Sequence, residues 1–467
     1  MQTPILHHVP AVKSWARNFK EVFANKPEYE HFKNYLTGLM TSERKNYSQI
    51  ANCMVKSADA SNISRFMDNE LWSGSELNDK RVSFMFERTK KIDSNAPAYL
   101  VLDDTLDEHV GTLFEHIAKH YDHSDSNYKL AQNPVTSHYV RGKVSFPLDF
   151  RVYRTYDEVT DWEAHFQKHF QDVAIPKMSK ERNKIKRKYE RQLLDKDPEF
   201  AKKHASFKTK IELAGELVDD AVKRQADFSV VLFDSWYLAP ALVTIIENHQ
   251  KTWISVLKKN RNLETASLKL YDEQGQPLVF DTPEIKVELL VPCIPKTAYK
   301  KVVIDVDTSY WAFSFSAKIP TLGTVRLVVS FDNAECTGSY AVLVTRQMSW
   351  ESTKIIGTYC RRFQIEVFYK DAKQLLGFSD YQCRSKTAIQ KHWYLVFCAY
   401  SFLRLDLLLS PAYQTWQRQL KTIGTALRRQ AQTVIEQLLL ACHRILASAP
   451  NTQKLFKLLF PRIVKLP

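Results

Sequence analysis

Three acidic residues stand where separate elements of the chain could bring them together. Asp104 closes the apolar run Tyr99-Leu100-Val101-Leu102, Asp234 closes a second run over 228–233, and Glu366 lies in a segment with helical spacing. Carboxylates are the hard oxygen ligands that divalent ions prefer, and two such ions about 3.5–4 Å apart can cleave a phosphodiester bond. The pattern therefore predicts that Asp104, Asp234 and Glu366 hold two Mg²⁺ or Mn²⁺ ions.

Asp103 is the alternative to Asp104 in the first position. Successive side chains of a strand point to opposite faces, so only one of the two can join such a site. We choose Asp104 because it directly precedes Thr105, and the alternative stays open. Each acid alone is weak support, since aspartate at a strand end is also common in turns.

The segment around Glu366 adds basic and phenolic side chains. Tyr359, Arg362, Glu366, Lys370 and Lys373 follow one another at steps of 3, 4, 4 and 3 residues, which places all five on one face of a helix. A carboxylate flanked by cations suits a metal site that also grips a nucleic-acid phosphate. An exposed amphipathic helix with ion pairs four residues apart is the structural alternative.

The spacing Tyr-x2-Arg-x3-Glu-x6-Lys, from Tyr359 to Lys373, resembles the signature of insertion-sequence DDE transposases of the retroviral-integrase superfamily. The two runs that end in aspartate are similar to that family's aspartate motifs, and the stretch between Asp234 and Glu366 is similar to its β-strand insertion. The resemblance implies an α/β fold with an RNase H-like catalytic core, in which helices flank a mixed sheet. A β-rich module would be inserted in this core, with helical regions at both ends of the chain.

The same resemblance implies an activity, namely metal-dependent strand cleavage and strand transfer at transposon ends. It implies the metal triad named above as the catalytic residues. It further implies phosphate contacts from four side chains of the Glu366 segment: Tyr359, Arg362, Lys370 and Lys373. The expected partners are double-stranded DNA, as transposon ends and target, and a second copy of the chain in a homodimeric complex with DNA.

The family also has an aromatic residue that stacks on a base flipped out of the duplex. Trp311, Tyr340 and Trp350 are candidates for it, although a place in the aromatic core is the alternative for each. Two other functions stay open for the whole chain. One is a catalytically inactive or domesticated DNA-binding protein, against which the retention of all three acids argues, and the other is a stand-alone RNase H-like nuclease.

The charge of the chain fits a nucleic-acid partner. Its 467 residues include 66 Lys and Arg against 52 Asp and Glu, a net charge of +14, and such an excess attracts polyanions. A basic helix is expected from Lys177 to Gln192, where eight of sixteen residues are Lys or Arg. Lys184, Arg187 and Lys188 in this helix are candidate DNA contacts.

Apolar runs and cysteines indicate the cellular compartment. The sequence contains no run of about 20 apolar residues, the length that would span a bilayer. Seven scattered cysteines without a C-x-x-C pair indicate a reducing compartment. We therefore expect no membrane partner and a cytoplasmic, nucleoid-associated protein of a bacterium.

Changes of pattern divide the chain into five expected segments. They are a helical DNA-binding region at 1–92, the first part of the RNase H-like core at 93–262, a β-rich insertion at 263–345, the end of the core with the Glu366 helix at 346–380, and a helical region at 381–467.

Within these segments the spacing predicts individual elements. Strands are expected at Pro134–Val140 and Ser145–Tyr156 in the core, and short β-type runs in the insertion at Val287–Val291, Lys301–Val306, Trp311–Ala317, Thr324–Phe331 and Tyr340–Thr345. Beyond them, Ile355, Tyr359, Phe363 and Val367 recur every four residues and predict a helix with a buried stripe.

Overall fold

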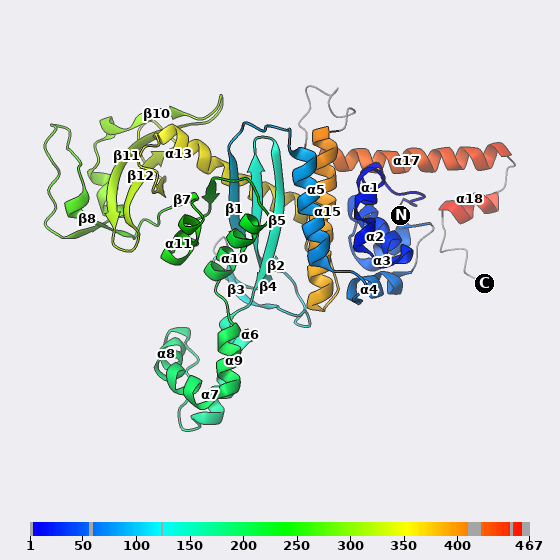
Figure 1. Cartoon of the computed structure of the whole chain (residues 1–467), viewed down its shortest axis with the longest axis horizontal. Coiled ribbons are helices and arrows are strands. Elements are labelled where there is room, and N and C mark those ends of the chain that lie inside the picture. The colour runs from blue at the N-terminus through cyan, green and yellow to red at the C-terminus, as the bar shows by residue number, and fades with distance from the viewer. Residues whose placement is uncertain (1–2, 56–58, 123–124, 410–421, 449–451, 460–467) are drawn as a thin grey trace.

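A mixed sheet runs through the centre of the molecule and carries the strands that end in the aspartates (Figure 1). The computed structural model describes residues 3–55, 59–122, 125–409, 422–448 and 452–459. Five strands form the middle of the sheet in the order β5-β4-β1-β6-β7. Their bounds are β1 Ala98–Asp104, β4 Asn127–Arg141, β5 Val144–Tyr153, β6 Val230–Leu232 and β7 Thr252–Val256.

The direction of these strands follows from how they are connected. β1, β4 and β5 form an antiparallel meander, whereas β6 and β7 run parallel to β1. Parallel neighbours need a crossover, and helices supply it. This mixed α/β arrangement is consistent with an RNase H-like fold. The first half of β4 also pairs with two short strands, β2 Asp107–Glu108 and β3 Ala118–Asp122.

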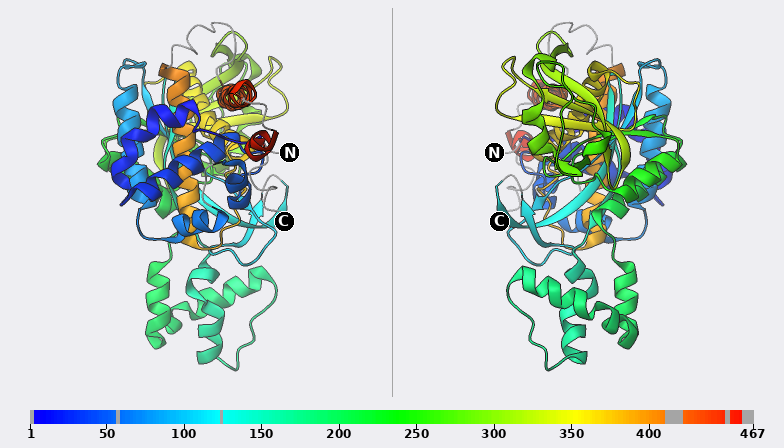
Figure 2. Two further views of the ribbon diagram at one scale, coloured as in Figure 1. Left: turned by 90° about the vertical axis from the view of Figure 1, so that its right-hand side faces the viewer. Right: turned by 90° about the vertical axis from the view of Figure 1, so that its left-hand side faces the viewer.

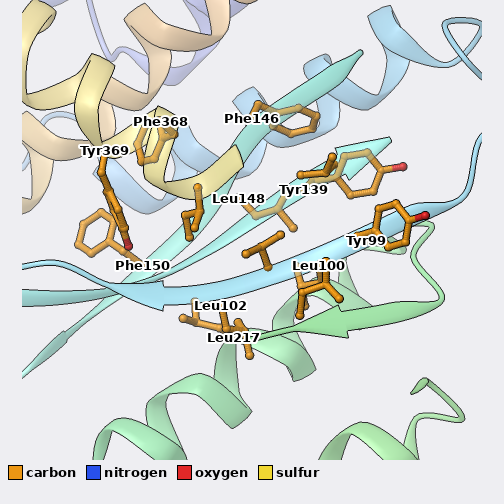
Figure 3. Close-up of a cluster of buried hydrophobic side chains, with 14 of the residues drawn as sticks. Tyr99, Leu100, Leu102, Tyr139, Phe146, Leu148, Phe150, Leu217, Phe368 and Tyr369 are labelled. Atoms are coloured by element: carbon orange, nitrogen blue, oxygen red, sulfur yellow. The ribbon is translucent and has the colours of Figure 1, made fainter. Parts of the chain in front are cut away.

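β1 is buried on both faces because helices cover each side of the sheet. Leu100 and Leu102 point toward Leu217 of α10 (Lys210–Lys223), while Phe368 and Tyr369 of α14 (Phe363–Leu375) cover the opposite face (Figure 3). Even-numbered residues of β1 therefore face α10, and odd-numbered residues face α14. A capping box between Thr209 and Glu212 fixes the start of α10.

The β-rich stretch that follows β7 extends the same sheet. β13 pairs with β7, and β12, β11 and β10 follow outward. The bounds are β8 Asn262–Glu264, β9 Glu284–Lys286, β10 Lys300–Val303, β11 Ser309–Ile319, β12 Gly323–Phe331 and β13 Tyr340–Thr345, with β8 and β9 forming a separate hairpin. Four of the five expected β-type runs are confirmed as strands, with shifted ends in most cases.

The fifth expected run, Val287–Val291, is wrong. It forms helix α12 (Val287–Leu290) and a 3₁₀ turn over Val291–Cys293. Val287 and Leu290 are buried three residues apart, which is helical spacing, and Pro292 cannot donate to a strand ladder. A short apolar run does not by itself distinguish the two conformations.

The predicted stripe from Ile355 to Val367 is wrong in its second half. Helix α13 (Ser352–Tyr359) is followed by a 3₁₀ turn (Cys360–Arg362) before α14 begins. A 3₁₀ turn has about 3.0 residues per turn, so it rotates the next helix relative to the last. Phe363 and Val367 are consequently 47% exposed each, and α14 buries another face, made by Ile365, Phe368, Tyr369 and Ala372.

Helices from both ends of the chain pack together beside the sheet (Figure 1). α15 packs against α2, α4 and α5, and α17 packs against α2 and α15. Their bounds are α1 Pro10–Trp15, α2 Lys26–Thr41, α3 Tyr47–Cys53, α4 Ala60–Asp68, α5 Gly74–Thr89, α15 Lys386–Leu409, α17 Ile423–Ser448 and α18 Thr452–Leu459. One hydrophobic core joins these helices to the sheet. None of the described helices is long and apolar enough to cross a membrane.

Four helices between β5 and α10 form a separate lobe, which projects from one edge of the sheet in every view (Figures 1 and 2). They are α6 Tyr156–Thr160, α7 Trp162–His169, α8 Ser179–Lys196 and α9 Pro198–Ser206. This helical lobe (156–206) has its own small core, made by Trp162, Phe166, Leu193 and Phe200. The expected basic helix is confirmed as α8.

Candidate active site

Asp103 and Asp104, at the end of β1, point to opposite faces of the sheet, as the strand geometry requires. Asp103 accepts a hydrogen bond of 3.0 Å from Nη1 of Arg362, which precedes α14. Asp104 instead meets α10, where Nζ of Lys210 lies 2.7 Å from its Oδ2. The two neighbouring acids therefore belong to two different environments.

Asp234 follows the end of β6, which runs parallel to β1 with Val101 opposite Leu232. The pairing ends there, and its register extended by two residues would bring Asp103 opposite Asp234. Residues opposite each other in parallel strands face the same side of the sheet. The Asp104 carboxylate also acts on Asp234, since its charge raises the pKa of Asp234. Oδ1 of Asp234 accepts a hydrogen bond of 2.9 Å from the backbone N–H of Trp236, which fixes the turn after β6.

Glu366 reaches the same side through Arg362. One nitrogen of the Arg362 guanidinium binds Asp103, and the other donates to Oε1 of Glu366. The Glu366 side chain is 47% exposed, whereas that of Arg362 is 11% exposed. The structure thus links Asp103 and Glu366 on the α14 side of the sheet through the largely buried guanidinium of Arg362.

Asp104 is held by three donors on the other side. Besides Lys210, Tyr237 donates to its Oδ1 at 2.7 Å and Asn133 donates to its Oδ2 at 2.9 Å. Both carboxylate oxygens of Asp104 therefore accept hydrogen bonds, as do those of Asp103, whose Oδ1 accepts from the backbone N–H of Asp104 at 2.9 Å. The sequence did not single out Lys210 or Tyr237, because nothing in its local pattern shows that the start of α10 lies beside the end of β1.

The pKa values of these three partly buried aspartates reflect their neighbours. Burial, together with the nearby Asp104 and Asp234 carboxylates, raises the pKa of Asp103 to about 7, although Arg362 opposes the shift. Burial likewise raises the pKa of Asp234, and the charge of Asp104 adds to it. Burial also acts on Asp104, but Lys210, Tyr237 and Asn133 outweigh it and lower the pKa.

The remaining residues of the Tyr-Arg-Glu-Lys pattern have different surroundings. Lys373 donates to Thr105 Oγ1 at 2.7 Å and to the carbonyl of Leu106 at 2.6 Å, so it clamps α14 onto the segment that follows β1. Tyr359 is buried with its ring 5.7 Å from the Arg362 guanidinium. Lys370 is exposed to solvent.

A pocket of about 1060 Å³ opens over this edge of the sheet. Asp103, Asp104 and Asp234 line it, together with Lys210 and Lys373. Trp236 also lines the pocket and is 57% exposed, which is unusual for so large an apolar side chain. Its exposure could not be predicted, because only Asp234 and Ser235 separate Trp236 from the buried β6 run.

Residues 18–302 match the family model described as DDE superfamily endonuclease. The chain belongs to this superfamily. The matched region contains both β1 aspartates and Asp234, and it ends before Glu366. A search of curated proteins finds no match to the chain.

DDE endonucleases typically use divalent metal ions, and the donor set of this DDE endonuclease fits such an ion. The pocket offers hard carboxylate oxygens from three aspartates, and burial raises the pKa values of Asp103 and Asp234. Among the residues that the structure describes, no three acidic, histidine or cysteine side chains converge into a ready-made metal cage. Arg362, between Asp103 and Glu366, holds the position of a cation there.

The other candidates from the sequence lie away from the carboxylates. Lys184, Arg187 and Lys188 are exposed on α8 of the helical lobe. The three candidate stacking residues of the DDE endonuclease, Trp311, Tyr340 and Trp350, are partly buried and pack against the main core.

Proposed function

We propose that this DDE endonuclease is a transposase of an insertion sequence, which binds transposon ends and catalyses metal-dependent strand cleavage and strand transfer. The observation that carries the proposal is the meeting of three chain segments at one sheet edge, where Arg362 links the end of β1 to Glu366. A family match alone supports only a DNA endonuclease. The added element is the Tyr-Arg-Glu-Lys spacing from Tyr359 to Lys373, which resembles that of insertion-sequence transposases.

The metal ligands we propose are Asp103, Asp234 and Glu366, binding two Mg²⁺ or Mn²⁺ ions. The sequence favoured Asp104 over Asp103, and Asp104 remains the alternative. Two features support Asp103: it shares an arginine with Glu366, and the register of β1 and β6, extended beyond their paired residues, would bring it opposite Asp234. The three donors to Asp104 suit a positioning role instead. Ions bound there would activate the attacking water or 3′-hydroxyl and stabilise the leaving oxygen.

The chain's own residues would orient the DNA. Arg362 has a planar fork of donors that suits a phosphate once a cation satisfies the carboxylates. Lys373 lines the pocket with its ammonium held near Thr105, and the exposed Lys370 lies on the same helix. We include Tyr359, at the base of this group, as a support for Arg362 and a candidate phosphate contact.

The proposed partners are double-stranded DNA and a second copy of the chain. Joining two transposon ends requires two sites in one assembly, so a homodimer on DNA is the simplest arrangement. The expected five segments belong to this proposal, with 1–92 as the end-binding region, 263–345 as the β-rich insertion and 381–467 as a helical end. Association with the bacterial nucleoid would follow from DNA binding.

Matched substitutions test the metal site. Asp103→Asn and Asp104→Asn each remove one charge at nearly constant shape, and Glu366→Gln and Asp234→Ala serve as references. We expect the Asp103, Asp234 and Glu366 variants to lose Mg²⁺-dependent DNA cleavage by about three orders of magnitude, since metal stabilisation contributes several kcal/mol. Asp104→Asn should lose about tenfold, as a positioning residue does.

DNA binding without metal and the circular dichroism spectrum should stay close to wild type in all four variants. Full cleavage by Asp234→Ala or Glu366→Gln would remove the proposed triad. A larger loss in Asp104→Asn than in Asp103→Asn would restore Asp104 as the ligand.

A second assay separates the transposase from a stand-alone nuclease. The wild-type protein is incubated with precleaved end DNA that carries a 3′-hydroxyl and with a supercoiled target plasmid. Joined products are expected from a transposase. Cleavage of intact DNA without any joined product would instead indicate a nuclease, and neither reaction would indicate an inactive DNA-binding protein.

A further inference from the structure

Helix α8 of the helical lobe has an inner face whose charges are neutralised. Arg182 pairs with Asp157 at 3.0 Å and also with Glu163, and Lys186 pairs with Asp157 at 2.5 Å. The Lys186 ammonium also lies 4.9 Å from the centre of the Trp162 ring. Further along the same face, the rings of Tyr189 and Phe166 are in contact, and Leu193 is buried. This face holds the lobe together.

The outer face of α8 carries five basic residues, which we call the cationic stripe. They are Lys180, Lys184, Arg187, Lys188 and Arg191, and all five are exposed. Their helical spacing places them within one arc, which extends over about 16 Å at 1.5 Å per residue. Within the described part of the chain, none of the five forms an ion pair. Their charge is therefore directed at solvent.

The lobe that carries this stripe grows from the active-site edge of the sheet. β1 and β5 are both antiparallel to β4, so they end at the same edge. The chain leaves the sheet after Tyr153 at the end of β5 and returns at Lys210, whose ammonium binds Asp104. Figures 1 and 2 show the lobe projecting outward from that edge. The lobe therefore stands next to the carboxylates, where a duplex with its cleaved bond at these acids could reach it.

The chemistry of the stripe selects one class of partner. A helix that binds a membrane surface needs an apolar face at the lipid, but the apolar residues of α8 are used in the core of the lobe. Five exposed cations in a line match the evenly spaced charges of a nucleic-acid backbone. Side chains of this type contact phosphates and carry no base readout of their own along such a line.

We propose that the cationic stripe is a second DNA-binding surface, which holds the backbone of the duplex beside the cleaved bond without reading its sequence. The position beside the cleaved bond rests on the proposed function. The binding itself does not, because it is measured without metal and without cleavage. The structure also distinguishes basic residues of α8 that look alike in the sequence. Arg182 and Lys186 form ion pairs inside the lobe and stabilise its fold, whereas the five residues of the stripe form none in the described part of the chain.

The experiment measures the salt dependence of DNA binding by the full-length protein. A fluorescent 40-bp duplex of random sequence is titrated in EDTA at several NaCl concentrations, for wild type and for Lys184→Gln/Arg187→Gln/Lys188→Gln. Each phosphate contact contributes about 0.9 to the slope of log affinity against log salt. The triple variant should therefore show a slope smaller by about 2 to 3, and a Kd raised at least tenfold at low salt.

A charge-preserving variant, Lys184→Arg/Arg187→Lys/Lys188→Arg, is the matched control and should keep the wild-type slope. Equal slopes for the glutamine variant and wild type would overturn the proposal, and the stripe would then be a solvated surface only. A reduced slope in both variants would also overturn it, because the charge would not be the cause. If wild type binds with the expected slope but never cleaves, the proposed function fails while this inference stands.

Discussion

Arg362 is the residue on which the geometry of the site depends most. Its guanidinium contacts Asp103 and Glu366 at once, while its side chain stays 11% exposed. A planar fork can satisfy two carboxylates in fixed directions, whereas the ammonium of a lysine is a single point of charge. Arg362 therefore both neutralises the acids and sets the orientation of Glu366 relative to β1.

Substitution of Arg362 by lysine separates these two roles. Arg362→Lys keeps the positive charge, so the salt dependence of DNA binding should match wild type. Cleavage should fall about 10- to 100-fold, because one ammonium cannot span both carboxylates. Arg362→Ala should lower the salt slope by about 1 as well. The measurements are metal-free binding and Mg²⁺-dependent cleavage, and wild-type cleavage by Arg362→Lys would show that the fork is dispensable.

At this scale the sequence offers the acids as candidates but not their partners. Asp234 and Glu366 can be singled out because strand-end and helical patterns are local, and their role as metal ligands stays a prediction. The choice of Asp104 over Asp103 also stays a prediction, since it depends on which face of β1 meets α14. Lys210 and Tyr237 were missed because their contact with Asp104 joins parts of the chain far apart in sequence.

Helix α14 is the element that brings the third acid to the sheet. Tyr369 donates to the backbone carbonyl of Asp103 at 3.1 Å, and Lys373 holds the segment after β1. The helix ends at Leu375, and Gly377 follows with a φ of +70°. A glycine in this left-handed conformation is a common way to end a helix. Lys45 packs directly against Gly377.

Gly377→Ala tests this helix end. Backbone strain alone should lower the free energy of unfolding by about 1–2 kcal/mol. The collision of the new Cβ with Lys45 should add to this loss. Gly275→Ala is the matched control, since Gly275 has a φ of +75° and nothing lies within 4 Å of its ideal Cβ. Urea unfolding of both variants measures the difference. Equal losses would show that Lys45 moves aside without cost.

Patterns of apolar residues predicted most elements but missed their interruptions. The strands that end at Asp104 and near Asp234 were found because each is a buried run closed by acids. The 3₁₀ turn over Cys360–Arg362 was missed because helical spacing continues through it unchanged. The lobe was missed as a unit, although α8 was expected, because its packing depends on contacts between four short helices.

Across the whole molecule, a buried polar cluster joins the two ends of the chain. Asp406 of α15 accepts hydrogen bonds from Nε1 of Trp15 at 2.8 Å and from Nε2 of Gln430 at 3.2 Å. Gln430 in turn accepts from the backbone N–H of Ala11 at 3.0 Å. The helices at 10–15 and 423–448 are therefore tied to each other through α15, and the terminal regions act as one unit.

The pH dependence of stability follows from Asp406. Burial raises its pKa to about 6, although Trp15 and Gln430 oppose the shift. The folded protein therefore favours the protonated Asp406 side chain. Protonation of Asp406 stabilises the fold fully below about pH 4, the pKa of an unfolded aspartate, and this stabilisation is lost as the pH rises through 6. Relative to Asp406→Asn, wild type should lose at most about 3 kcal/mol of unfolding free energy between pH 4.5 and 7.5.

Urea unfolding of both proteins across this pH range provides the measurement. The comparison between the two proteins cancels the other titrating groups, which are common to both. Parallel pH profiles would mean that Asp406 stays ionised in the fold throughout.

The helical lobe begins and ends at almost the same point, since the Lys210 ammonium lies 5.4 Å from the centre of the Tyr153 ring. The segment between Tyr153 and Lys210 contributes no strand to the sheet, so the sheet could keep its strand order without it. A gene could gain, lose or exchange this segment in one step, and the catalytic framework would keep its strand order. Engineers could use the same junction to graft a foreign DNA-targeting module next to the candidate active site.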